Sequence, residues 1–162
     1  MSAELARRGV DRSLLSDRDD SVDVGVGGSW KGAAGKLDLD ARVDVTGTSE
    51  GYAVALDYSY PLTLGRTTLV PSVGAVRLSA DMADYYYGIL DEEVARGVAA
   101  YRPGAATVPR ASLSLVHPFA KRWVLLGNLE YRALPDALQD SPLVEAGKDR
   151  STSLFIGISR GF

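Results

Sequence analysis

Charged side chains, three of them acidic, occupy every second position in KLDLDARVD, residues 36–44. Asp38, Asp40 and Asp44 are of a type that could supply the carboxylate oxygens of a calcium site. Such a site needs a turn with a glycine to bring its oxygens together, whereas this alternation predicts a strand with residues about 3.3 Å apart. We therefore expect the carboxylates to line an aqueous surface, with calcium binding as the weaker alternative. No metal or cofactor is expected.

Other residues with catalytic potential are not arranged in a recognisable pattern. Glu130, Asp136 and Asp140 could contain a glycosidase pair, but suitable carboxylates are common by chance. His117 is the single histidine, and no fixed nucleophile lies near it, so a catalytic triad is not expected. The sequence thus predicts a protein that is not an enzyme. The alternative is a membrane-barrel enzyme acting on lipid or peptide, which would need a serine and an acid within reach of His117.

The composition excludes several classes of protein. The chain has 162 residues, a formal net charge of −3 and no cysteine. This charge offers no basic surface for nucleic acid, so no nucleic-acid partner is expected. The lack of cysteine excludes disulfides and cysteine metal sites. No apolar run approaches the roughly 20 residues of a membrane-spanning helix, and residues 1–20 contain no apolar signal-peptide core.

Seven stretches of alternating apolar and polar residues must position the charged side chains. In the first three stretches the alternating run is about 9 to 11 residues long, the length that a tilted strand needs to cross a bilayer. The alternation is less clear in the fourth stretch, where Pro71 suggests a bulge or an irregular register. The seven stretches cover residues 20–30, 36–47, 51–62, 66–80, 109–119, 122–134 and 151–162.

The connections between these stretches are alternately short and long. The short ones are GAAGK, PLTLG and PFAKR, and the long ones cover residues 46–51, 81–104 and 135–150. Outer-membrane barrels have brief periplasmic turns and extended outer loops, an asymmetry that a soluble barrel does not need. We therefore expect an all-β, antiparallel, transmembrane up-and-down β-barrel over residues 20–162 in the cell outer membrane of a Gram-negative bacterium. Its long outer loops would lie at about 80–104 and 135–150, and residues 1–19 would form an outer loop or a disordered start.

The polar faces of the strands carry charges of both signs. An Arg or Lys on a lipid-facing surface costs about 2–4 kcal/mol at the bilayer midplane, so these residues are expected to face a wet interior and to pair across strands. A soluble ligand-binding barrel, with its apolar face inward, is the alternative fold. The expected lumen-lining residues are Asp38, Asp40, Arg42, Asp44, Asp57, Arg110, Glu130 and Arg132.

Aromatic residues on the apolar faces gather near the strand ends that the connections assign to the periplasm. Amphipathic rings prefer the membrane–water interface, so these rings are expected to form an aromatic belt in contact with outer-membrane lipid. Phe162 is also expected to belong to the carboxy-terminal signal read by the barrel-insertion machinery. The belt residues are Trp30, Tyr58, Tyr60, Phe119, Trp123 and Phe162.

Seven strands is an odd number, whereas single-chain bacterial barrels have an even number. An open edge in lipid would leave backbone groups unpaired. We therefore expect further amino-terminal strands, with Met1 an internal or misassigned start. In the loop at 81–104, Leu90, Val94 and Val98 follow helical spacing after an acidic start. This predicts a short helix that either covers the pore mouth or binds a partner.

Two loop segments carry motifs that resemble the MipA/OmpV family of Gram-negative outer-membrane proteins. The segments are DMADYYYGILDEEVARGVAAYRPGA and LPDALQDSPLV, followed by a terminal strand that ends in phenylalanine. The resemblance covers roughly residues 20–162, and the chain departs from the family at its front, where the signal peptide and first strands are missing. The matching motif positions are Tyr86, Tyr87, Gly88, Glu92, Glu93, Tyr101, Pro103, Gly104, Asp140, Ser141 and Pro142.

The resemblance implies a non-enzymatic outer-membrane scaffold that binds other cell-envelope components. The founding member is described as linking a lytic murein transglycosylase to a peptidoglycan synthase, which makes these two enzymes the expected partners. A pore for small polar solutes is the alternative function, because the expected inner face is charged.

Overall fold

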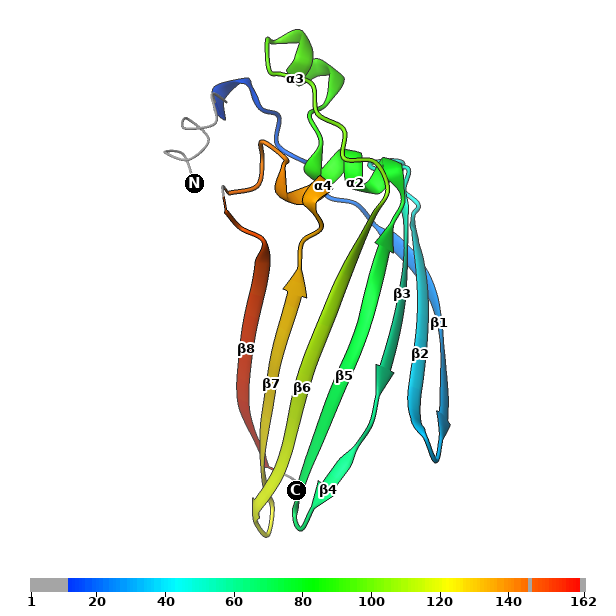
Figure 1. Cartoon of the computed structure of the whole chain (residues 1–162), viewed down its shortest axis with the longest axis vertical. Helices are drawn as coiled ribbons and strands as arrows, with labels where there is room; N and C mark the ends of the chain where they lie inside the picture. The colour runs from blue at the N-terminus through cyan, green and yellow to red at the C-terminus, as the bar shows by residue number, and fades with distance from the viewer. Residues whose placement is uncertain (1–11, 146, 161–162) are drawn as a thin grey trace.

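The protein is a curved antiparallel sheet with short helices at one end, seen in a computed structural model that describes residues 12–145 and 147–160 (Figure 1). The strands pair in sequence order from β1 to β8, except that short β4 pairs only with β5. This order confirms the predicted all-β, antiparallel, up-and-down class. The strands are β1 (Asp23–Gly32), β2 (Gly35–Asp44), β3 (Tyr52–Ser59), β4 (Leu62–Leu64), β5 (Thr67–Leu78), β6 (Ala106–Ala120), β7 (Trp123–Ala133) and β8 (Arg150–Arg160).

Strands β3 and β4 are two parts of one long strand, which corresponds to the third of the seven predicted strands. Both parts pair with β5 in the same register. Between them the Tyr60 amide donates to the Pro71 carbonyl at 3.1 Å. The reciprocal bond cannot form because Pro71 has no N–H group. The irregularity expected at Pro71 is therefore an interruption of its partner strand and not a bulge in β5.

Two local expectations from the sequence are wrong. The turn expected over PLTLG is shorter, because Leu62–Leu64 continue the strand and the turn occupies residues 65–66. The pairing of β5 with β6 continues without a shift through Pro71. A register shift lies instead between Pro118 and Ala120, at the end of β6.

The register assigns the side chains of every strand to one of two faces. Asp57 lies opposite Asp38 on β2 and Gly74 on β5, Gly74 lies opposite Arg110, and Arg110 lies opposite Arg132. Directly opposed residues point to the same side of a sheet. We call this side the inner face, because it lines the cavity described below, and the other side the outer face.

The outer face is apolar and is not covered by the described part of the chain. Val26 on β1 is 77% exposed and Ile156 on β8 is 67% exposed, and the other large apolar residues of this face are similarly open. An uncovered apolar surface of this extent indicates contact with a partner or a membrane. Among the described residues, the buried apolar ones lie at the end of the molecule that carries the long loops: Ala53, Met82, Ala83, Ile89, Val98, Ala106 and Leu138.

In the described part of the chain, four short helical segments gather at the end of the molecule opposite the hairpin turns, the loop end (Figure 1). They are the 3₁₀ segment η1 (Arg12–Leu14), α2 (Ala80–Tyr87), α3 (Asp91–Ala95) and α4 (Asp136–Gln139). The helix expected around Leu90–Val98 is thus limited to α3, while α2 and α4 were not predicted. The Ser79 side chain caps α2 by accepting from the Met82 amide at 3.2 Å. Within residues 12–145 and 147–160, every helix is too short or too polar to span a bilayer.

Candidate functional site

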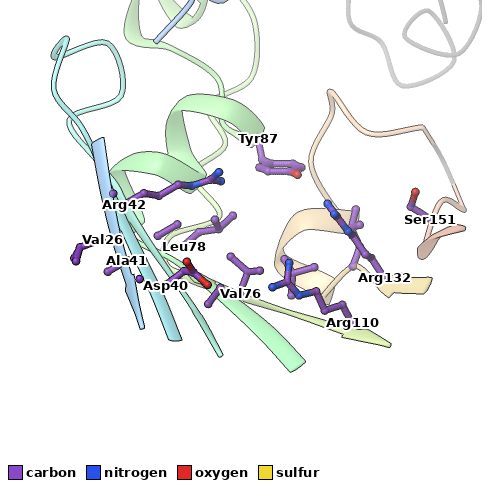
Figure 2. A pocket seen from close by; sticks show the side chains of 16 residues that line it. Val26, Asp40, Ala41, Arg42, Val76, Leu78, Tyr87, Arg110, Arg132 and Ser151 are labelled. Atoms are coloured by element: carbon purple, nitrogen blue, oxygen red, sulfur yellow. The ribbon is translucent and has the colours of Figure 1, made fainter. Parts of the chain in front are cut away.

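A cavity of about 720 Å³ lies between the inner face of the sheet and helix α2 (Figure 2). Strands β1, β2, β3, β5, β6, β7 and β8 contribute to its wall, and Tyr87 at the end of α2 lies above it. Arg42, Arg110 and Arg132 extend into this space from different strands, together with Asp40 (Figure 2). The cavity therefore combines a polar wall with a helical roof.

Asp57 and Arg110 form the most closely paired charges of the inner face. The Arg110 Nε atom donates to Asp57 Oδ1 at 2.8 Å, and Nη2 donates to Oδ2, so the pair is bidentate. The pair crosses strand β5 directly above Gly74, which is the register partner of both residues. A Cβ atom at position 74 would overlap the Asp57 carboxylate and the Leu56 carbonyl. Gly74 thus provides the space that lets an ion pair span three strands.

The other predicted lumen-lining charges pair locally, in part with residues that the sequence did not single out. Arg132 donates to Glu130 at 2.6 Å on the same strand. Arg42 lies 3.4 Å from Asp23 across β1 and β2. Lys36 lies 2.7 Å from Asp38, which also accepts from Ser29. Asp23, Lys36 and Ser29 share the inner face with their partners, so the alternation could have revealed them once the register was known.

Asp44 lies on the inner face but organises a loop and does not line the cavity. Its carboxylate accepts from the Thr46 amide at 2.8 Å, the Ser49 amide at 2.5 Å and the Glu50 amide at 3.2 Å, and the residue is buried. Asp40 instead borders the cavity itself. The aspartates of β2 therefore do not converge on one point, as a calcium site would require.

The inner face becomes apolar where the helices meet it. Ala83 of α2 and Leu138 of α4 are fully buried against Ala106, and Leu78 and Val108 pack around them. This contact explains the ambiguous alternation of the fourth predicted strand. Its inward-facing residues at the loop end are apolar because they meet protein and not water.

Hydrogen bonds between the two loop segments that carry the family-like motifs hold the long loops together above the cavity. Ser141 is fully buried, and its hydroxyl donates to the Tyr87 carbonyl at 2.5 Å and accepts from the Leu143 amide at 3.1 Å. The Tyr101 hydroxyl donates to the Ala137 carbonyl at 2.7 Å. Burial, and to a lesser extent the charge of Asp140, raises the pKa of Tyr101, so this donor stays protonated.

Two glycines of the motifs occupy positions that disfavour a side chain. A Cβ atom on Gly88 would overlap the Asp84 carbonyl. Gly104 has a φ of +66°, and its amide donates to Asp84 Oδ1 at 2.7 Å. Asp84 thus anchors the return of the loop. Tyr86 contacts the Ser21 hydroxyl at 2.8 Å, and Pro103 and Pro142 are both half-buried.

A buried ion pair fastens the amino-terminal segment to α3. Glu93 is fully buried and accepts from Arg18 at 2.8 Å, from the Ser16 amide at 2.9 Å and from the Leu90 amide at 2.7 Å. Arg18 also donates to the Tyr85 carbonyl at 2.8 Å. Helix α3 therefore packs against residues 14–18 and does not line the cavity, which α2 borders through Tyr87.

The predicted belt aromatics lie toward the hairpin end and are exposed. Tyr58 donates to the Ala34 carbonyl of the first hairpin turn. Arg160 lies over the Trp123 ring at 5.5 Å. Phe162 lies outside the described residues. The described members of the belt are Trp30, Tyr58, Tyr60, Phe119 and Trp123.

The antiparallel order, the alternating faces and the charged inner face are consistent with part of an outer-membrane β-barrel, and the sheet of the described residues is open between β1 and β8. The chain belongs to the MipA family: the family described as "MltA-interacting protein MipA" matches residues 1–162. This confirms the resemblance on which the loop motifs were assigned and places the protein in the Gram-negative outer membrane.

Named relatives agree with this assignment. YiaT of Escherichia coli (strain K12), named as an outer membrane protein, is 31% identical over 91% of this chain and 60% of its own length. The MltA-interacting protein of the same organism is 30% identical over 81% of this chain and 53% of its own. OmpV of Vibrio cholerae is 27% identical over 82% and 51%. The chain thus spans half to three fifths of these relatives. No solved structure matches it.

Proposed function

We propose that the protein is a structural barrel that binds other components of the cell envelope through its hairpin end. The hairpin turns are short and are expected in the periplasm, where murein-processing enzymes act. The name of the Escherichia coli relative, MltA-interacting protein, supports a murein transglycosylase as the partner.

The charge of the hairpin end is the observation that carries this proposal. The described residues near the three turns include no Asp or Glu between 24 and 37, between 58 and 76 or between 111 and 129. Of the lysines and arginines near these turns, only Lys36 has a carboxylate partner within the described part of the chain. A rim of one charge sign attracts and orients a partner of the opposite sign. The cations of this end are Lys31, Lys36, Arg66, Lys121, Arg122 and Arg160.

Reversing two of these charges is expected to weaken partner binding. The double variant K121E/R122E alters an exposed turn, and we expect its affinity for purified murein transglycosylase to fall about tenfold at low salt. Surface plasmon resonance on the purified full-length protein measures this loss. The control variant R96E/R102E also reverses two positive charges, but at the loop end, and should bind within twofold of wild type. Absence of binding to the wild type, or equal loss in both variants, would contradict the proposal.

The outer face is inferred to contact membrane lipid. Leu39 lies in the middle of β2 on the outer face and is 51% exposed. Leu39→Arg is expected to lower the free energy of unfolding by about 2–4 kcal/mol, because a cation near the bilayer midplane is poorly solvated. Urea unfolding in lipid vesicles measures the loss. The neighbouring inner-face change Asp40→Asn should cost less than about 1 kcal/mol of the free energy of unfolding. A larger loss for Asp40→Asn than for Leu39→Arg would show that the lipid-facing side of the sheet has been assigned wrongly.

A pore for small polar solutes is a second candidate, favoured by the charged inner face. The packing of α2 and α4 against that face argues for a low conductance, because it narrows the loop end of the interior. Current through planar bilayers that contain the full-length protein separates the two functions.

The proposed function includes no catalytic step. His117 Nδ1 lies 2.8 Å from the Thr67 hydroxyl. The register places His117 opposite Leu125, on the outer face. A histidine on that face, away from the charges of the cavity, is badly placed to act as a general base for a polar substrate.

A further inference from the structure

The strongest unassigned feature is the group of arginines that share the cavity beneath α2. Arg110 and Arg132 are direct register partners on β6 and β7. Two like charges at opposed positions repel one another unless a counter-charge intervenes. Arg42 extends into the same cavity from the other side, under Tyr87 (Figure 2). Three guanidinium groups therefore border the cavity, Arg42 on one side and Arg110 with Arg132 on the other, and each lies beside a carboxylate of the sheet.

The protein itself uses only part of the hydrogen-bonding capacity of these guanidinium groups. Each guanidinium has five N–H donors. Arg132 donates through Nε to Glu130, and Arg42 is paired through Nε with Asp23. Within residues 12–145 and 147–160, the terminal amino groups of Arg132 and Arg42 have no protein acceptor. Their side chains are 51% and 56% exposed, so these donors are open to the cavity.

Much of the remaining cavity wall is apolar, and its roof is held in place. Val76, Leu78, Val108 and Leu134 form one part of the wall, and Tyr87 closes it from above. The Tyr87 backbone is fixed by the buried Ser141 hydroxyl, so the roof is positioned before any ligand arrives. A volume of about 720 Å³ falls in the range of small-molecule sites.

We propose that this cavity binds a small organic monoanion that has a carboxylate at one end and an apolar body. The carboxylate is bound by the open terminal amino groups of Arg132, because a planar guanidinium matches a carboxylate in two parallel hydrogen bonds. The apolar body packs against Val76 and Val108, beneath Tyr87. Asp40 on the opposite wall disfavours a second negative charge. This binding site is independent of the proposed partner surface at the hairpin end.

Binding can be tested with 4-fluorobenzoate and its neutral analogue 4-fluorobenzyl alcohol. The full-length protein is purified in a non-ionic detergent, and ¹⁹F NMR line broadening gives the dissociation constants. We expect 4-fluorobenzoate to bind at least tenfold more tightly than the alcohol. Equal binding of the two probes, or no saturable binding of 4-fluorobenzoate, would overturn the proposal, because apolar partition into micelle or protein would then account for the signal.

Variants locate the site within the barrel. Arg132→Gln is expected to weaken 4-fluorobenzoate about tenfold without affecting the alcohol. Arg132→Lys keeps the charge but loses the paired, coplanar N–H donors of the guanidinium group, so it should weaken binding about threefold. Arg77 lies on the outer face of the same sheet, where it donates to Thr107, and Arg77→Gln is the matched control with an expected change below twofold. If Arg77→Gln weakens the carboxylate probe as much as Arg132→Gln, the cavity is not the site.

Discussion

Replacing Gly74 with alanine is expected to lower the free energy of unfolding by about 3 kcal/mol. A Cβ atom at this position would overlap both the Asp57 carboxylate and the Leu56 carbonyl. The Asp57–Arg110 pair, which crosses β5 above Gly74, must then separate or the strands must move apart. Separation leaves two half-buried charges without their partners. Urea unfolding in lipid vesicles, followed by tryptophan fluorescence, measures the loss.

A matched glycine and a double-mutant cycle identify the cause. Gly28 lies on β1 of the same sheet, and a Cβ atom there would meet nothing within 4 Å, so Gly28→Ala should change stability by less than about 0.5 kcal/mol. In an Asp57→Ala background, Gly74→Ala should cost about 1 kcal/mol less than in the wild type, because one of its two collisions is gone. If the costs of Asp57→Ala and Gly74→Ala simply add, the ion pair and the glycine are not coupled.

The sequence predicts the sheet well where one face meets water and the other does not. In β2, Asp38, Asp40 and Arg42 alternate strictly with apolar residues, so strand, length and face all follow from the pattern. The outer face of the described strands is apolar for the same reason. The pairing partners do not follow, because the alternation has a period of two and leaves the register open. The Asp57–Arg110 contact across Gly74 becomes visible only when three strands are aligned.

The loop end could not be predicted in this way, because its contacts join segments far apart in the chain. Leu78 and Val108 face inward although they are apolar, since helices α2 and α4 cover them. Ser141 and Tyr87 are 54 positions apart, and Arg18 and Glu93 are 75 apart. The family-like motifs singled out Tyr87, Glu93 and Ser141. No local pattern of the sequence predicts which residue each of them contacts. The resemblance also gave no sign of Arg18.

Arg18→Ala is expected to remove about 3 kcal/mol or more from the local stability of the loop end. Glu93 is fully buried, and Arg18, which is 18% exposed, is its cationic partner. Removal of one member of a buried pair leaves an uncompensated charge, which is costly. The change also removes hydrogen bonds to the Tyr85 and Gly88 carbonyls. Hydrogen exchange at pH 7 should show loss of protection at the amides of α3 and at the Ser16 amide.

The pH dependence of this local stability should change sign between wild type and variant. Burial raises the pKa of Glu93, but hydrogen bonds from Arg18 and from the Leu90 and Ser16 amides outweigh it, so the folded-state pKa lies below the ordinary value of 4.5. The unfolded segment then binds more protons than the folded one between these two pKa values. The stabilisation is therefore complete above pH 4.5 and is lost as the pH falls through the folded-state pKa.

In the Arg18→Ala variant, the hydrogen bond from Arg18 no longer offsets the effect of burial on Glu93. The pKa of Glu93 should therefore lie above its ordinary value. The folded segment then binds more protons than the unfolded one, so acidification from pH 7 should restore part of the lost protection. Arg102→Ala is the control: it removes a slightly shorter pair with Asp91, at 2.6 Å, whose side chains are 60% and 88% exposed. An exposed pair contributes about 0–1 kcal/mol, so protection should barely change. Equal effects of Arg18→Ala and Arg102→Ala, or an Arg18→Ala variant that loses further protection on acidification, would show that Glu93 is solvated.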